Sequence, residues 1–202
     1  MLARSVLHSI IAAILFMALV VASAASESND KTDRLGVPGP IAFEGRDYAL
    51  ASTSHPQADY FQQEYLPSGQ SLDNYTHMFL IETLTANVTP KDAAASQIAM
   101  LDQRKGKDPL VNHEANVNEA TGEVMLDFLV SGASNGKLVV EWNAYRFAPL
   151  KGNKPGVVLH GISRRAYGEE DAKKFLTGLK DWRSDAKNAL TGFNAPAVNP
   201  QP

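Results

Sequence analysis

The side chains best suited to binding lie on two neighbouring stretches, residues 137–147 and 157–167, in which apolar and polar residues alternate as they do in β-strands. We predict that these stretches form a hairpin in which residue 148 lies roughly opposite residue 157. Glu141 then faces Arg164, and the surrounding polar groups could form a recess for an acidic or amide-bearing ligand, or for a loop of a partner protein. The candidate binding residues on this sheet surface are Glu141, Asn143, Tyr145, His160 and Arg164.

The same residues also have an ordinary structural interpretation. Charge pairs at a solvated sheet margin contribute about 1 kcal/mol or less each, and a register slip of one residue would place Glu141 and Arg164 on opposite faces. A second charge pair is predicted from the Asn135-Gly136 turn, which places Asp127 diagonal to Arg146 on the opposite surface of the sheet.

Composition excludes several other kinds of chemistry. The chain has 202 residues, with 19 Lys and Arg, 22 Asp and Glu, and no cysteine. The mixed charge argues against nucleic acid as a partner, and the lack of cysteine removes disulfides, thiolate zinc sites and cysteine nucleophiles. The sequence has no G-x-S-x-G, H-E-x-x-H, Walker or G-x-G-x-x-G motif, and its histidines beyond the first 24 residues fall in different elements. We therefore expect a protein without enzymatic activity, metal or cofactor.

The first 24 residues have the pattern of a signal peptide. Arg4 precedes an unbroken apolar run, Ile10–Val21, and the small residues Ala22–Ala24 suit signal peptidase. We predict cleavage between Ala24 and Ala25. A retained membrane anchor is the alternative, but the apolar run is shorter than the roughly 20 residues that a span needs. Because the remaining 178 residues (202 less 24) can form a stable core without disulfides, we expect a periplasmic or secreted bacterial protein with no membrane span after cleavage.

Beyond the leader, residues 25–38 and 191–202 are polar or proline-rich, and we expect a flexible N-terminal segment and a disordered tail around one domain, residues 39–190. Turn residues and hydrophobic periodicity predict that domain's strands and helices. The expected strands cover 40–43, 46–52, 59–66, a run from residue 78, 111–119, 123–131, 137–147 and 157–167, and the expected helices run from 90 to about 106 and from 169 onwards.

The last four strands should form an antiparallel meander that is partly apolar on both faces. We therefore predict an α+β fold in which helices cover both faces of an antiparallel sheet, a three-layer α/β/α sandwich.

This order of elements resembles the PsbP-like α/β/α sandwich, to which DcrB-type periplasmic proteins also belong. The segments Glu64–Leu72 and Val140–Phe147 are similar to stretches in short exported proteobacterial proteins of unknown function. The resemblance implies a non-enzymatic accessory or binding role, and it assigns a role to no particular residue.

Our leading functional hypothesis is an exported, soluble accessory protein that binds a protein partner in the bacterial envelope. Aromatic residues of the N-terminal half could anchor that partner if they are exposed, or else they are half-buried strand residues. The alternative function is a small-molecule or lipid carrier or sensor, with a pocket between sheet and helix. The aromatic residues concerned are Tyr48, Tyr60, Phe61, Tyr65 and Tyr75.

Overall fold

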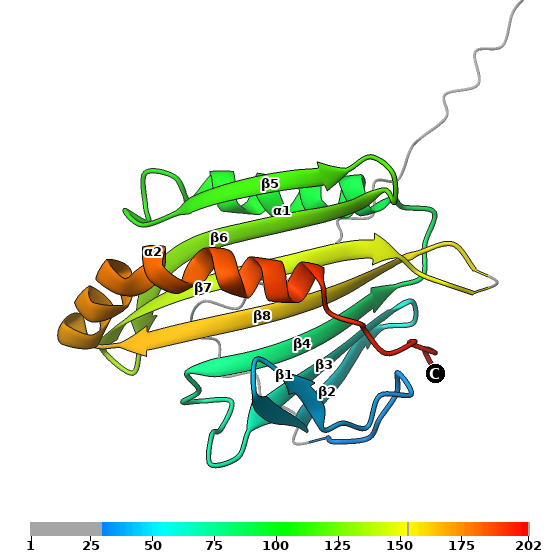
Figure 1. The fold of residues 1–202 in the computed structure, drawn as a ribbon, viewed down its shortest axis with the longest axis horizontal. Coiled ribbons are helices and arrows are strands. Elements are labelled where there is room, and N and C mark those ends of the chain that lie inside the picture. Colours follow the sequence, from blue (N-terminus) through cyan, green and yellow to red (C-terminus); the bar gives the residue numbers. More distant parts are fainter. Residues whose placement is uncertain (1–29, 153, 202) are drawn as a thin grey trace, which may run out of the picture.

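The computed structural model describes residues 30–152 and 154–201, so the predicted leader and its Ala24–Ala25 junction lie outside the described residues. An eight-stranded sheet with the order β1-β2-β3-β4-β8-β7-β6-β5 forms the centre of the fold, and every neighbouring pair is antiparallel (Figure 1). The strands are β1 (Ile41–Phe43), β2 (Arg46–Gln57), β3 (Tyr60–Pro67), β4 (His77–Leu84), β5 (Asn112–Asn118), β6 (Glu123–Ser134), β7 (Lys137–Pro149) and β8 (Val157–Tyr167). This architecture confirms the α+β class and the antiparallel sheet.

Two helices accompany the sheet, and local sequence explains where each begins. In α1 (Pro90–Arg104), Thr89 accepts a hydrogen bond from the backbone of Asp92, and the Asp92 carboxylate bonds back to the Thr89 backbone, which completes a capping box. In α2 (Glu169–Thr191), the first turn carries three acidic residues, which interact favourably with the helix dipole. No helix among the described residues is long and apolar enough to cross a membrane.

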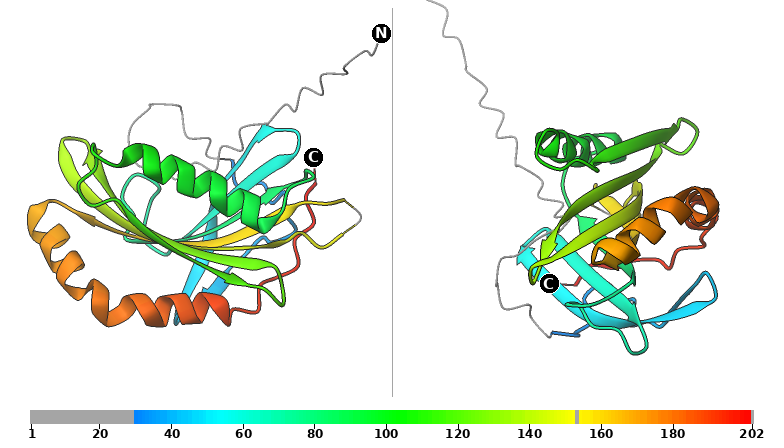
Figure 2. Two further views of the ribbon diagram at one scale, coloured as in Figure 1. Left: turned by 90° about the horizontal axis from the view of Figure 1, so that it is seen from above. Right: turned by 90° about the vertical axis from the view of Figure 1, so that its left-hand side faces the viewer.

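The sheet carries two separate apolar clusters because successive side chains of a strand point to opposite faces. The first cluster contains Phe128 together with Ala94 and Leu101 of α1, and the second contains Trp142 together with Ala186 of α2. Figure 2 shows the two helices beside the sheet. We name the two faces of the sheet after these aromatic residues, the Phe128 face and the Trp142 face. Apolar side chains along one side of α2, including Phe175, Leu179 and Trp182, pack against the second cluster.

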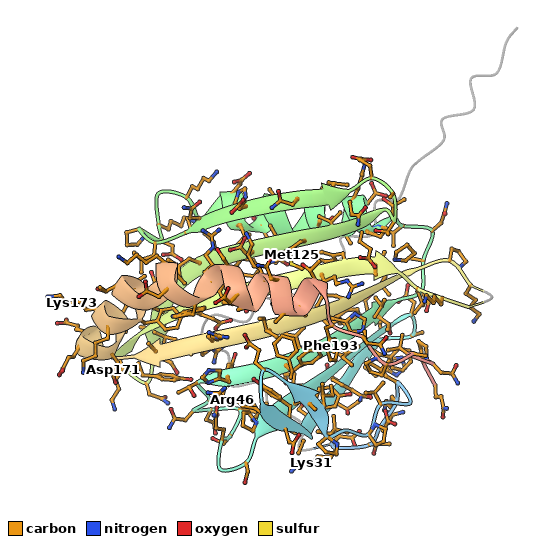
Figure 3. The ribbon with its side chains drawn as sticks, in the orientation of Figure 1. Lys31, Arg46, Met125, Asp171, Lys173 and Phe193 are labelled. Atoms are coloured by element: carbon orange, nitrogen blue, oxygen red, sulfur yellow. The ribbon has the colours of Figure 1, made fainter. Side chains whose placement is uncertain are left out.

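Both ends of the domain are packed, which corrects the expectation of a flexible segment and a disordered tail for the residues described. Leu35 is fully buried, and its backbone accepts a hydrogen bond of 2.7 Å from the backbone of Asn199. Phe193, labelled in Figure 3 just beyond α2, packs its ring 5.5 Å from that of Phe43 and 5.3 Å from that of Phe79. The folded unit therefore extends beyond residues 39–190 on both sides.

Candidate functional site

The predicted register of the β7–β8 hairpin is wrong by one residue. Glu141 lies opposite Arg165, Asn143 opposite Ser163, and Tyr145 opposite Gly161. As a result, the five residues predicted to share one recess are divided between the two faces. Glu141, Asn143 and Tyr145 lie on the Phe128 face, whereas Arg164 and His160 lie on the Trp142 face, opposite Trp142 and Arg146 respectively.

The register differs because β7 continues to Pro149, which pairs with Val157. A hydrogen bond of 2.9 Å from the Leu150 backbone to the Gly156 carbonyl closes the loop beyond that pair. A loop of this length fixes register less strictly than a two-residue turn does. Because both faces of the two strands are buried, the hydrophobic pattern does not select the register either.

On the Phe128 face, Glu141 forms a buried ion pair with Arg165, which replaces the predicted pair with Arg164. Glu141 is 3% exposed, and the Arg165 guanidinium lies over the ring of Tyr75, 4.1 Å from its centre. Burial acts to lower the pKa of Arg165, but the neighbouring Glu141 carboxylate outweighs that effect and holds the pKa above its ordinary value. The Arg165 guanidinium therefore keeps its charge inside the protein at any physiological pH.

A second acidic group lies on the same face at Glu82 of β4, which is 2% exposed. The Tyr60 hydroxyl donates a hydrogen bond of 2.9 Å to its Oε2. Burial raises the pKa of Glu82 to about 8, although the hydrogen bond from Tyr60 acts in the opposite direction. Burial, followed by the charge of Glu82, raises the pKa of Tyr145 well above its usual value. These side chains are thus protonated at neutral pH and are able to donate hydrogen bonds.

Gly161 makes the position of Tyr145 possible. A Cβ atom on Gly161 would lie 3.0 Å from Cδ1 of Tyr145 and 2.9 Å from Cγ of Leu80, closer than side chains normally approach. The absence of a side chain at this position of β8 lets the Tyr145 ring lie across the neighbouring strand.

Two buried amides on the Phe128 face have unpaired atoms. Asn143 is 0% exposed, and neither Nδ2 nor Oδ1 has a hydrogen-bond partner among the described residues. Gln97, 1% exposed on the buried stripe of α1, likewise has no partner for Oε1 within the described part of the chain. Buried polar atoms usually obtain a partner from the protein, from ordered water or from a ligand. We call the following set the polar cluster: Tyr60, Tyr75, Glu82, Gln97, Glu141, Asn143, Tyr145 and Arg165.

Asp127 and Arg146, predicted as the second charge pair, do lie diagonally on the Trp142 face, but each binds other groups. Arg146 pairs with Glu123 at 2.9 Å and donates to the backbone carbonyl of Phe193 at 3.0 Å, beyond the end of α2. The Arg146 side chain therefore fixes the segment that follows α2.

The Asp127 carboxylate attaches the middle of α2 to the sheet. Its side chain is 1% exposed and accepts hydrogen bonds from Trp142 Nε1 at 3.0 Å, Arg183 Nε at 2.5 Å and Lys187 Nζ at 3.0 Å. Burial alone would raise the pKa of Asp127, but these three donors together lower it below its ordinary value. Asp127 thus holds α2 against the sheet.

His160 and Arg164 also have separate surroundings on the Trp142 face. Burial, together with the charge of Arg146, lowers the pKa of His160 to about 4. Arg164 pairs with Glu44 at 2.6 Å and lies over the ring of Trp182, 4.3 Å from its centre. Neither residue contributes to the polar cluster.

The aromatic anchors suggested for a protein partner are interior residues. Tyr48, Tyr60, Phe61, Tyr65 and Tyr75 are between 0% and 7% exposed. They belong to the two apolar clusters, so no exposed aromatic patch forms from these five side chains.

Sequence reasoning missed several members of the polar cluster, and for two of them a signal exists. Glu82 interrupts the apolar strand Met78–Leu84, and Gln97 interrupts the buried stripe of α1 between Ala94 and Leu101. A polar residue at a core position departs from the apolar pattern of its helix or strand, and such departures are expected at functional or strained sites. Arg165 could be placed in the site only with the correct register.

Within the described residues, no three His, Asp or Glu side chains are arranged to hold a metal ion.

A protein-family model matches residues 35–195. The chain belongs to this uncharacterised protein family. The family region begins at the fully buried Leu35 and includes every helix and strand of the described residues. No curated protein and no solved structure matches the chain.

Proposed function

We propose that the protein is an exported, non-enzymatic carrier or sensor that holds a small polar molecule between its sheet and α1. In this proposal the leader pattern of residues 1–24 directs export to the periplasm or beyond, and the fold is a three-layer α/β/α sandwich of the PsbP-like type. The observation that carries the proposal is the Asn143 amide, which is fully buried on the face packed against α1 and unpaired at both of its atoms.

The energetic argument rests on the unpaired atoms. Leaving a buried donor or acceptor unsatisfied costs about 1–3 kcal/mol, so Asn143 alone would cost several kcal/mol of a total stability of about 5–15 kcal/mol. A bound molecule that hydrogen-bonds this amide would recover much of that energy. Binding at this position therefore couples directly to the stability of the fold.

The polar cluster indicates the chemistry of the ligand. Asn143 offers both donors and an acceptor, Gln97 offers an acceptor, and the nearby acids and tyrosines are either paired or protonated. The cation in the polar cluster, Arg165, is neutralised by Glu141. A neutral ligand with an amide or hydroxyl group and a small apolar remainder suits this chemistry, because Phe128 lies opposite Asn143 on β6 and belongs to the apolar cluster of this face.

The test is native mass spectrometry of the protein produced from its complete coding sequence and purified without denaturation. We expect a bound small molecule in the wild type that is absent from Asn143→Leu and depleted in Gln97→Leu. The exposed Asn188→Leu serves as the matched control and should retain it. Thermal melts establish that each variant is folded. A wild-type protein that carries ordered water only, or an equal load in Asn143→Leu, would overturn the proposal.

The second candidate function is that of an accessory protein that binds an envelope or secreted protein. The buried aromatic residues no longer support it. What supports it is the outer edge of β5, which pairs with no further strand among the described residues and is able to accept one.

A further inference from the structure

Glu82 is a buried acid that forms no ion pair with a basic side chain of the described residues. It is 2% exposed, and the Tyr60 hydroxyl donates a hydrogen bond of 2.9 Å to its Oε2. Arg165, the cation of the polar cluster, pairs with Glu141 instead. A buried carboxyl without a cation takes up a proton, because an isolated charge is costly inside a protein. Glu82 therefore carries an O–H group that can donate a hydrogen bond.

Tyr145 brings a second donor to the same part of the Phe128 face. A Cβ atom on Gly161 of β8 would lie 2.9 Å from Cγ of Leu80 and 3.0 Å from Cδ1 of Tyr145, so the tyrosine ring crosses β8 toward β4. Figure 1 shows β8 between β7 and β4. Glu82 follows Leu80 by two residues on β4 and projects to the same face. The Tyr145 hydroxyl forms no hydrogen bond with another described residue.

Two neutral O–H donors on an apolar face are complementary to one oxygen that accepts two hydrogen bonds. A carbonyl oxygen has two lone pairs and no proton, so it matches both donors. A tyrosine and a protonated carboxylic acid held together in an apolar site bind such an oxygen in other proteins. An anionic ligand is disfavoured, because the charges of Glu82, Glu141 and Glu64 all act on Tyr145. An ammonium group would bring donors to donors.

We propose that the molecule held between the sheet and α1 is a neutral carbonyl compound, an amide or a ketone, whose oxygen accepts hydrogen bonds from Tyr145 and Glu82. The inference rests on the proposed function, since it identifies the ligand class of the same face. Asn143 precedes Tyr145 by two residues on β7, about 7 Å along the strand. A second polar group of the ligand is therefore able to reach the Asn143 amide.

Three probes of similar size and different charge test the carbonyl assignment, namely benzamide, benzoate and benzylamine. Each is titrated at neutral pH into the protein purified for mass spectrometry, and binding is followed by ligand-observed NMR. Benzamide should bind with a dissociation constant of about 1 mM, as expected for its size, and the two charged probes at least about tenfold more weakly. Excess benzamide should also displace a molecule that co-purifies with the wild type. Absence of benzamide binding, equal binding of all three probes or tighter binding of benzylamine would overturn the assignment.

Removing one hydroxyl tests the role of Tyr145. Tyr145→Phe keeps the ring over Gly161, so the variant should fold and should bind benzamide at least about fivefold more weakly than the wild type. Tyr48→Phe is the matched control, because Tyr48 is 2% exposed and belongs to the cluster on the Trp142 face. Thermal melts establish that both variants are folded. An unchanged affinity in Tyr145→Phe, or an equal loss in Tyr48→Phe, would contradict the proposal.

The pH dependence of binding tests the role of Glu82. Once ionised, Glu82 has no proton to donate and presents only acceptors to the carbonyl oxygen. The wild type should bind benzamide at least about tenfold more weakly at about pH 9.5 than at about pH 6.5, whereas Glu82→Gln, which keeps a donor, should bind about equally at both. Parallel pH profiles for the two proteins would refute the role of Glu82. The titratable groups that face the pair are unchanged in the variant: Tyr60, Tyr75, Glu64, Glu141 and Arg165.

The carrier function and the carbonyl assignment can fail separately. If a molecule co-purifies and is lost from Asn143→Leu but fully retained in Tyr145→Phe, the carrier function stands and the carbonyl assignment falls. If the wild type carries no molecule, the carrier function falls, and the benzamide titration still decides whether Tyr145 and Glu82 bind a carbonyl oxygen.

Discussion

Replacing Glu82 with glutamine should make the protein more stable at alkaline pH. In the folded chain the pKa of the Glu82 carboxyl is raised from its ordinary value of 4.5 to about 8, so the group remains protonated at neutral pH. The folded state thus binds this proton more tightly than the unfolded state. The contribution of the Glu82 proton to the free energy of unfolding is fully present below pH 4.5 and is lost as the pH rises toward 8. Glutamine mimics the protonated carboxyl and still accepts the hydrogen bond from Tyr60.

The magnitude follows from the difference between the two pKa values. Each pH unit between 4.5 and 8 reduces stability by about 1.4 kcal/mol, so the full effect of Glu82 approaches about 5 kcal/mol, to within a factor of two. Between pH 6.5 and 8 the wild type should lose about 2 kcal/mol relative to Glu82→Gln. The groups that face Glu82, namely Tyr60, Tyr145 and Glu64, remain in both proteins.

Urea unfolding at several pH values, followed by the fluorescence of Trp142 and Trp182, measures this difference. The matched control is Glu119→Gln, because the Glu119 side chain is 77% exposed and its substitution should leave the pH dependence unchanged. Parallel stability curves for the wild type and Glu82→Gln between pH 6.5 and 8 would refute the reasoning, since they would mean that Glu82 is solvated or ionised in the folded state.

Three further predictions concern other buried groups. Asp127→Ala leaves the indole N–H of Trp142 unpaired and removes two charge-assisted hydrogen bonds to α2, so urea unfolding should show a loss of about 3–5 kcal/mol, whereas Asp127→Asn should lose less. His160 has a pKa of about 4 in the folded state, compared with an ordinary value of 6.5. Its contribution to stability is therefore present above pH 6.5 and is lost as the pH falls toward 4. His160→Leu should accordingly flatten the acid side of the stability curve measured by thermal melts. Gly161→Ala should displace the Tyr145 ring and reduce the free energy of unfolding by about 1–3 kcal/mol, and a crystal structure of the variant would show the shift.

Local signals in the sequence were sufficient to predict the elements of the fold. The Asn135-Gly136 turn is confirmed, with φ angles of 49° and 73°, and it joins Ser134 to Lys137 in the register expected of a tight hairpin. Pro90 and the residues before it define the start of α1, and the acids after Gly168 define the start of α2. In each case the signal lies within a few residues of the boundary that it determines.

The ends of the domain could not be predicted in the same way, because their order depends on distant partners. The backbone of Leu35 donates to the Gln63 side chain at 3.0 Å and accepts from Asn199. A polar, proline-rich composition is typical of mobile tails, but it also suits an irregular segment held by hydrogen bonds from elsewhere. Composition alone does not distinguish these two cases.

The candidate site shows the same division between local and distant information. Glu141, Asn143 and Tyr145 were correctly placed on one face, because alternation along a single strand follows from covalent geometry. Their partners on β8 were misplaced, because a loop from 150 to 156 connects the strands and a shift of one residue exchanges every cross-strand neighbour. When both faces of a strand are buried, the hydrophobic pattern does not select between the two registers, and only the packing of the whole sheet does. It follows that a polar residue inside an apolar run, such as Glu82, is a more dependable guide to a buried site than a charge pair inferred across a long hairpin loop, because its burial does not depend on the register.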